Sequence, residues 1–197
     1  DTGKNLFKPG STPRQNAQFL LFLAAFIKGV DEYQEMLRCC VSYPGNDHRL
    51  GGNEAPPAII SIFLGDELTA ILDSIIQGTE YVDITKKKLT IGVDTLPEIP
   101  QDTTDRNRTS PLAFTGNKFE FRMLGSSQSI ASPNVVLNTI MAEELSQFAD
   151  ILEKADDFQS ALQTLLHDTF TAHQRIIFNG NGYDESWVQE AKRRGLA

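Results

Sequence analysis

The sequence predicts an α+β fold in which a few strands are combined with helices, and in which helices dominate the C-terminal third. Two short runs have strand character: Ala58 to Leu64 is β-branched and apolar, whereas Lys118 to Leu124 alternates charged and apolar residues. Three helix-length stretches then follow, from Ser132 to Lys154, Asp157 to Arg175 and Asp184 to Arg194. The strands therefore precede most of the helices.

Length and composition limit the class of protein. The 197 residues, 40% of them hydrophobic, suffice for one core, and a formal net charge of -8 argues against binding to nucleic acid or to anionic membranes. The longest apolar run, Phe19 to Ile27, is much shorter than the roughly 20 residues that a membrane span requires. Cys39 and Cys40 are adjacent and build no disulfide framework. We therefore expect no nucleic-acid or membrane partner and a reduced, cytoplasmic location.

The N-terminal half alternates helices with irregular chain. One helix is predicted from Pro13 to Val41, and within it Phe19 to Ile27 is apolar on every side, which is typical of a helix inside a larger structure. We therefore expect Phe19 to Ile27 to be left under-covered in this chain, or to be covered by a partner copy. The glycines and prolines between Ser42 and Pro57 predict a polar loop, and Asp66 is expected to cap a helix that ends at Ile76. Residues Gln77 to Asp105 predict a short strand or helical turn followed by an irregular connection.

The loop from Ser42 to Pro57 holds the first group of residues that could bind a substrate or take part in a reaction. Arg49 can bind a carboxylate through two parallel hydrogen bonds, and Glu54 follows five residues later, where it can move a proton. His48 lies in the same dense segment, whereas His167 and His173 are expected on a solvated helix surface. The alternative for this segment is an ordinary solvated turn, because loops are generally polar.

Two further segments are candidate anion sites. Arg106 and Arg108 lie in a loop with hydroxyl groups and suit phosphate oxygens, unless they form a surface patch paired with Asp105. The strand that starts at Lys118 places Lys118, Glu120 and Arg122 on one face and apolar side chains on the other. A carboxylate between two cations suits a metal-bridged polyphosphate, and the alternative is a solvated sheet face.

Three segments in this order and spacing resemble glutamine synthetase, most closely the type III branch of that family. They read Asn46-Asp47-His48-Arg49-Leu50-Gly51-Gly52-Asn53-Glu54-Ala55-Pro56-Pro57, then Asp105-Arg106-Asn107-Arg108-Thr109-Ser110-Pro111, then Gly116-Asn117-Lys118-Phe119-Glu120-Phe121-Arg122. Asn5-Leu6-Phe7 and Ser132-Pro133-Asn134 resemble further segments of that family, so the resemblance covers essentially the whole chain.

The resemblance implies part of an ATP-dependent ligase that joins ammonia to L-glutamate through a γ-glutamyl phosphate, with Mg²⁺ or Mn²⁺ as the metal. Residues 1–197 would form the C-terminal part of the catalytic domain, with a few strands of a larger antiparallel sheet. The opening Asp1-Thr2-Gly3 in place of Met agrees with a piece of a longer chain. The first half of the catalytic domain and a β-grasp domain would lie upstream, and the parent enzyme would form homo-oligomeric stacked rings.

The resemblance also implies a role for each matching residue. Glu54 resembles the flap glutamate that takes a proton from ammonium, and Arg108 the arginine that stabilises the transferring phosphoryl group of ATP. Arg49 and Arg122 resemble arginines that bind glutamate, Glu120 resembles a metal ligand, and Lys118 takes the place of a nucleotide-contacting arginine. Lys118 keeps that charge but loses the planar fork.

The departures from the family pattern concern missing contacts. The interval from Arg49 to Glu54 is one residue shorter than in type I enzymes, and Ala113 lies in the region where type I carries a second phosphate-binding arginine. The Glu-x-Glu metal pair and the metal-binding His would lie upstream of Asp1. We therefore expect the isolated 197-residue chain to form no glutamine.

Two alternatives remain open at this point. One is a ligase of the same superfamily that joins glutamate to another amine. The other is a non-catalytic assembly or regulatory module. Such a module would not need Arg108, Glu120 and Arg122, so their presence argues against it. A kinase-like phosphotransferase is disfavoured because no glycine-rich phosphate loop occurs.

Overall fold

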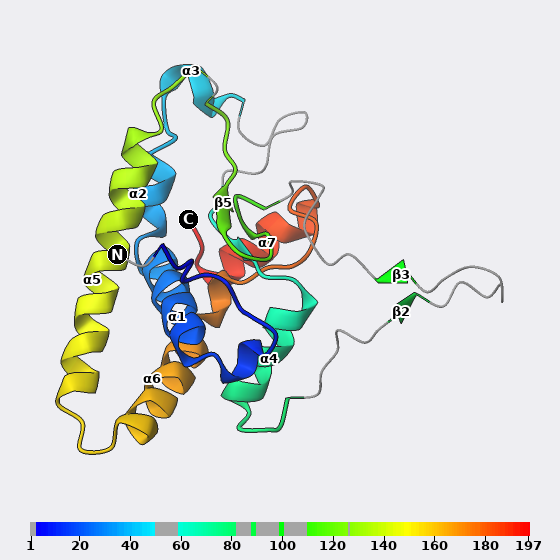
Figure 1. Ribbon diagram of the computed structural model, residues 1–197. Coiled ribbons are helices and arrows are strands. Elements are labelled where there is room, and N and C mark those ends of the chain that lie inside the picture. Colours follow the sequence, from blue (N-terminus) through cyan, green and yellow to red (C-terminus); the bar gives the residue numbers. More distant parts are fainter. Residues whose placement is uncertain (1–2, 50–58, 82–87, 90–98, 101–109, 126) are drawn as a thin grey trace.

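The computed structural model describes residues 3–49, 59–81, 88–89, 99–100, 110–125 and 127–197. In this part of the chain, helices surround a small sheet (Figure 1), so the predicted α+β class is confirmed. The two-residue strands β2 (Lys88–Leu89) and β3 (Ile99–Pro100) pair antiparallel and lie apart from the other elements. Within the described ranges, no helix has the length and apolarity needed to cross a bilayer.

The segment predicted as one helix from Pro13 to Val41 is divided into shorter elements. They are the 3-10 turn η1 (Pro13–Gln15), α1 (Ala17–Glu32) and α2 (Gln34–Cys39). Asn16 ends the first turn and caps α1, because its side-chain oxygen accepts a hydrogen bond from the Phe19 amide at 3.1 Å. Tyr33 separates α1 from α2 with φ -111° and ψ 23°. A short helix, α3 (Pro44–Asp47), lies in the predicted loop.

The remaining helices lie within two residues of their predicted bounds. They are α4 (Asp66–Ile76), α5 (Ala131–Glu153), α6 (Phe158–His173) and α7 (Glu185–Arg194). The end of the helix predicted from Asp157 to Arg175 is instead the 3-10 turn η2 (Gln174–Ile176). Asp157 caps α6 by accepting from two backbone amides, and Gly195 ends α7 with φ 69°. Such capping residues are local signals of where a helix begins or ends. The prediction that Asp66 caps α4 is wrong, because Gly65 lies at the N-cap and no side-chain cap bond forms.

The main sheet has three strands in the order β1 (Ile62–Phe63), β4 (Leu112–Phe114) and β5 (Phe119–Phe121). β4 and β5 are antiparallel, and Ala113 lies opposite Glu120. β1 and β4 are parallel, so the prediction of antiparallel strands is correct for only one of the two pairs. A parallel pair requires a long connection, and the chain between β1 and β4 includes α4.

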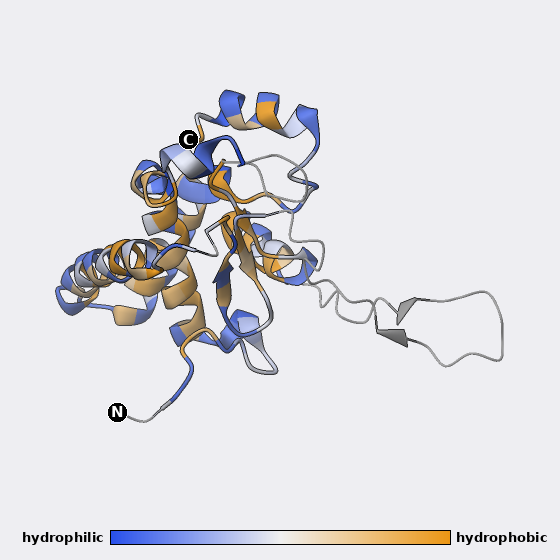
Figure 2. Ribbon diagram, turned by 90° about the horizontal axis from the view of Figure 1, so that it is seen from above, coloured by the Kyte–Doolittle hydropathy of each residue, from blue (hydrophilic) through white to orange (hydrophobic). Residues whose placement is uncertain are grey.

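Helix α1 lies at the centre of the core. It packs against both α5 and α6, and its apolar side chains also face the sheet, where the Phe19 and Phe114 rings lie 6.1 Å apart. Figure 2 shows the hydrophobic surfaces of the helices and sheet turned toward one another. Seven of the nine residues from Phe19 to Ile27 are buried, so the expectation that this segment is left under-covered or needs a partner copy is wrong.

Gly29 sets the distance between α1 and α5. A Cβ atom at this position would overlap Ile140 Cγ2 and would lie 3.2 Å from Glu144 Cγ. We expect Gly29→Ala to lower the free energy of unfolding by about 1–3 kcal/mol, because overpacking outweighs the ~1 kcal/mol gain in helix propensity. Denaturant unfolding of the chain measures this change. Gly45→Ala is the matched control, since a Cβ there meets nothing within 4 Å, and an equal loss in both variants would contradict the packing argument.

Candidate functional site

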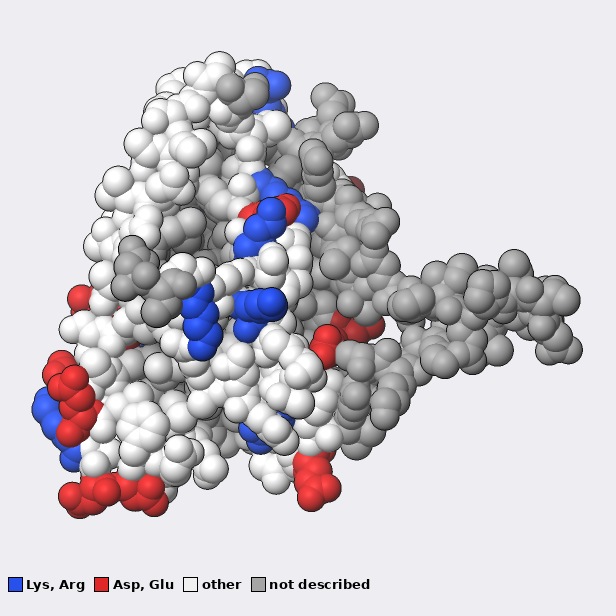
Figure 3. All heavy atoms as spheres, viewed as in Figure 1, with Lys and Arg blue, Asp and Glu red and all other residues white. Residues whose placement is uncertain are grey.

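The predicted charged face of the Lys118 strand is present on β5. Glu120 lies between two cations: its Oε1 is 3.3 Å from Lys118 Nζ, and its Oε2 is 3.1 Å from Nε and from an Nη atom of Arg122. Lys and Arg side chains gather around acidic atoms over this part of the surface in Figure 3. The structure therefore brings together three of the residues predicted as site residues.

The opposite face of β5 anchors the strand in the core. The Phe119 ring stacks on Phe26 of α1 with a centroid distance of 3.9 Å and an interplanar angle of 19°. Phe7 and Phe114 each meet the same ring edge-on at 5.3 Å. This aromatic cluster fixes the side of the sheet on which Glu120 emerges, because successive strand residues point to opposite faces.

The charge of Glu120 is stabilised by its neighbours. The hydrogen bonds from Arg122 and then from Lys118 hold the pKa of the Glu120 carboxyl below its ordinary value, against a smaller opposing effect of burial. The side chains differ in exposure: 14% for Arg122, 37% for Glu120 and 64% for Lys118. The two cations, Arg122 inside and Lys118 outside, can bind an anionic ligand, whereas the ionised carboxylate between them can bind a cation.

Arg49 lies three residues after Asn46, whose side chain is hydrogen-bonded to the backbone just beyond β5. It follows α3, its side chain is exposed, and its backbone amide donates to the Asn46 carbonyl oxygen at 2.9 Å. The Asn46 side chain in turn donates to the carbonyl oxygen of Leu124, just beyond β5, at 3.2 Å. Figure 1 shows α3 beside the segment that leads from β5 to α5. Glu54 and Arg108 lie outside the described residues.

Glu120 is the predicted metal ligand. Among the residues that the structure describes, no group of three or more His, Cys, Asp or Glu side chains could hold a metal ion. The ionised and partly exposed carboxylate of Glu120 fits a single ligand position for Mg²⁺ or Mn²⁺, which accept one or two protein carboxylates together with substrate phosphates. Because Arg122 contacts Oε2 and Lys118 contacts Oε1, a metal ion bound to Glu120 would share the carboxylate oxygens with these two cations.

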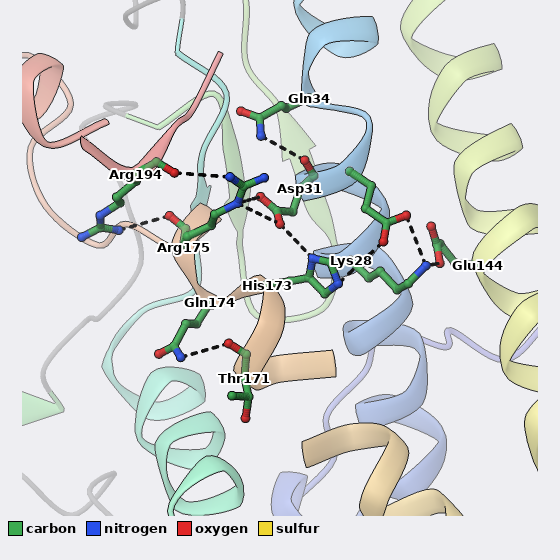
Figure 4. Close-up of polar contacts among 10 residues, drawn as sticks. Lys28, Asp31, Gln34, Glu144, Thr171, His173, Gln174, Arg175 and Arg194 are labelled. Carbon is green, nitrogen blue, oxygen red and sulfur yellow. Dashed lines mark hydrogen bonds and ion pairs between the residues drawn. The ribbon is translucent and has the colours of Figure 1, made fainter. Parts of the chain in front are cut away.

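A second polar network lies within the helical part and was not predicted. The carboxylate of Asp31, 3% exposed, accepts from Arg175 Nε at 2.8 Å and lies 2.8 Å from His173 Nδ1, as Figure 4 shows. His173 is only 15% exposed, so its predicted place on a solvated surface is wrong. Lys28 and the fully buried Glu144 form another ion pair of this region. The signal in the sequence was the charged Lys28 and Asp31 on an otherwise apolar helix.

Burial and pairing act in opposite directions on this second ion pair. Burial raises the pKa of the Glu144 carboxyl above its ordinary value, although Lys28 opposes the rise. Burial also lowers the pKa of the Lys28 amine, but its bonds to Glu144 and Glu32 outweigh that effect, and its pKa is raised. These groups join α1 to α5 and support the fold rather than the β5 face.

The fold and the β5 face together define an α+β protein with a surface suited to anionic ligands. Comparison with known sequences is specific. In an alignment of 200 positions that covers its whole length, the chain is 52% identical to a type-3 glutamine synthetase from Dictyostelium discoideum. It is also 46% identical to a glutamine synthetase from Bacteroides fragilis and 45% identical to one from Butyrivibrio fibrisolvens, again over its whole length. A family model of the glutamine synthetase C-terminal domain matches residues 161–197.

These matches confirm the resemblance to glutamine synthetase, including its type III branch. The chain spans only 27–28% of the length of these relatives.

Proposed function

We propose that residues 1–197 form the C-terminal part of the catalytic domain of a glutamate–ammonia ligase. The observation that carries this proposal is the position of Glu120 between Lys118 and Arg122 on β5, in a chain 52% identical to a type-3 glutamine synthetase. The β-grasp domain and the first half of the catalytic domain would precede Asp1. The intact protein would be a cytoplasmic homo-oligomer.

The proposed reaction has two steps. An oxygen of the glutamate γ-carboxylate attacks the γ-phosphorus of ATP, and the bond to ADP breaks to leave a γ-glutamyl phosphate. Ammonia then attacks the carbon of the γ-carboxyl group, phosphate leaves with the bonding electrons, and the attacking nitrogen loses a proton, which gives glutamine. Ammonium must lose a proton before it can attack, and this is the role proposed for Glu54.

The described residues would bind and orient the substrates. Arg122, which is 14% exposed, and Arg49 would hold glutamate carboxylates, for which guanidinium groups are well shaped. Lys118 would contact the nucleotide, and Glu120 would hold Mg²⁺ or Mn²⁺. When bound, the divalent cation would neutralise phosphate oxygens of ATP. Arg108, which lies outside the described residues, would stabilise the transferring phosphoryl group.

Phosphate release by the intact enzyme tests this function. We expect release from ATP to require both glutamate and ammonium, and the isolated 197-residue chain to release none. A preference for polyamines over ammonium would instead identify a glutamate–amine ligase. An intact protein without metal-dependent ATP binding would be an assembly or regulatory module. Turnover by the isolated chain would contradict the proposed division of the site.

A further inference from the structure

Asn46 joins two segments that are distant in the sequence. Its side chain is buried with 2% exposure, and its amide nitrogen donates to the carbonyl oxygens of Val41 at 3.0 Å and Leu124 at 3.2 Å. The first bond is local, but the second spans 78 positions of the chain. One primary amide therefore directs its two N–H donors to two backbone segments.

Each of these segments leads directly to an arginine of the proposed glutamate site. On one side, Arg49 is three residues after Asn46, and its amide donates to the Asn46 carbonyl oxygen at 2.9 Å. On the other side, Arg122 is two residues before Leu124, and its amide donates to the Pro111 carbonyl oxygen at 2.7 Å. The Asn46 side chain therefore connects the backbone near Arg49 to the backbone near Arg122 through one hydrogen bond, the bond to Leu124, and a few covalent bonds.

The backbone around Asn46 is itself held in place, so its side chain can fix the position of the segment to which it bonds. The amides of Asn46 and Asp47 both donate to the Tyr43 carbonyl oxygen, at 2.8 and 2.9 Å, so the turn that holds Asn46 is closed. Because Asn46 is buried, water cannot readily replace its bond to Leu124, and loss of the amide would leave the partly buried Leu124 carbonyl oxygen without that partner.

We propose that Asn46 is a positioning residue that fixes the Arg49 loop against the end of β5, and so sets the relative place of the two arginines that bind glutamate. The inference rests on the proposed function. Asn46 touches no substrate, and it acts only through the backbones of the two segments. Its effect therefore falls on glutamate more than on ATP.

Steady-state kinetics of the intact enzyme test this role through Asn46→Ala and Asn46→Asp. Aspartate keeps the shape of the side chain but loses the amide donors. We expect the KM for glutamate to rise about tenfold in both variants, as for the loss of one positioning hydrogen bond, and the KM for ATP to change less than about twofold. Asn46→Ser, which retains one donor, should recover part of the affinity for glutamate.

Asn179→Ala is the matched control, because the Asn179 side chain also joins distant backbone: its Oδ1 accepts from the Leu64 and Gly65 amides at 3.0 and 3.1 Å. It should leave the ratio of the two KM values unchanged. An unchanged KM for glutamate in folded Asn46 variants, or an equal rise in both KM values, would overturn the positioning role alone. A wild-type enzyme that forms no glutamine would instead overturn the proposed function and, with it, this role.

Discussion

Glu120→Gln is expected to lower kcat/KM for glutamine formation by the intact enzyme by at least about 100-fold, as for loss of one charged group in a preorganised site. Glutamine has nearly the same shape but no charge. The carboxylate that lies 3.1 Å from Arg122 and 3.3 Å from Lys118 would be lost, and with it the proposed metal ligand. Steady-state assays at several Mg²⁺ concentrations measure the fall and any increase in the metal requirement.

Glu190→Gln provides the matched control for this substitution. Glu190 on α7 also lies between two arginines, with Oε1 2.7 Å from Arg193 and 2.6 Å from Arg194, and these partners lower its pKa to about 2. It is not part of the β5 face, so its loss should leave activity unchanged within about twofold, as for most surface changes. Similar losses in both variants would contradict a specific role for Glu120.

Phe26→Ala is expected to lower the free energy of unfolding by about 3–5 kcal/mol, the range for deletion of a large buried aromatic side chain. Phe26 is 6% exposed, stacks on Phe119 at 3.9 Å and meets Phe7 edge-on at 5.8 Å. The cavity would therefore open directly beneath β5. Denaturant unfolding of the chain measures the stability, and hydrogen exchange of the β5 amides measures local loosening.

Phe158→Ala is the control for the loss of an aromatic ring. Phe158, at the start of α6, is 51% exposed, so its removal should change the free energy of unfolding by no more than about 0.5 kcal/mol. A small effect of Phe26→Ala, comparable to that of this control, would contradict the view that α1 holds β5 in place.

The sequence was most informative where the signals are local. The alternation from Lys118 to Met123 predicted which side chains of β5 share a face, because strand periodicity does not depend on distant packing. In the same way, the predicted start of α6 and the predicted end of α7 lie within two residues of the observed ones, where Asp157 and Gly195 are the caps. The resemblance to glutamine synthetase added the proposed roles of Lys118, Glu120 and Arg122, which periodicity alone does not provide.

Features that depend on distant packing could not be predicted. The apolar helix from Phe19 to Ile27 was expected to need an external partner, but α5 and α6 cover it, and single-sequence patterns do not reveal which helices meet. The bond from Asn46 to Leu124 and the pairing of His173 with Asp31 also depend on contacts between distant segments. Placement of the short strand β4 beside β1 had no local signal.

Transfer of oxygen-18 from glutamate to phosphate tests the central claim most directly. The intact enzyme would be supplied with ATP, ammonium and glutamate labelled in the γ-carboxylate, and the released phosphate analysed by mass spectrometry. A γ-glutamyl phosphate intermediate predicts that each phosphate carries one oxygen from glutamate, since the bond between the γ-carboxyl carbon and that oxygen breaks when ammonia attacks. Glutamine formation with unlabelled phosphate would contradict this account of the site.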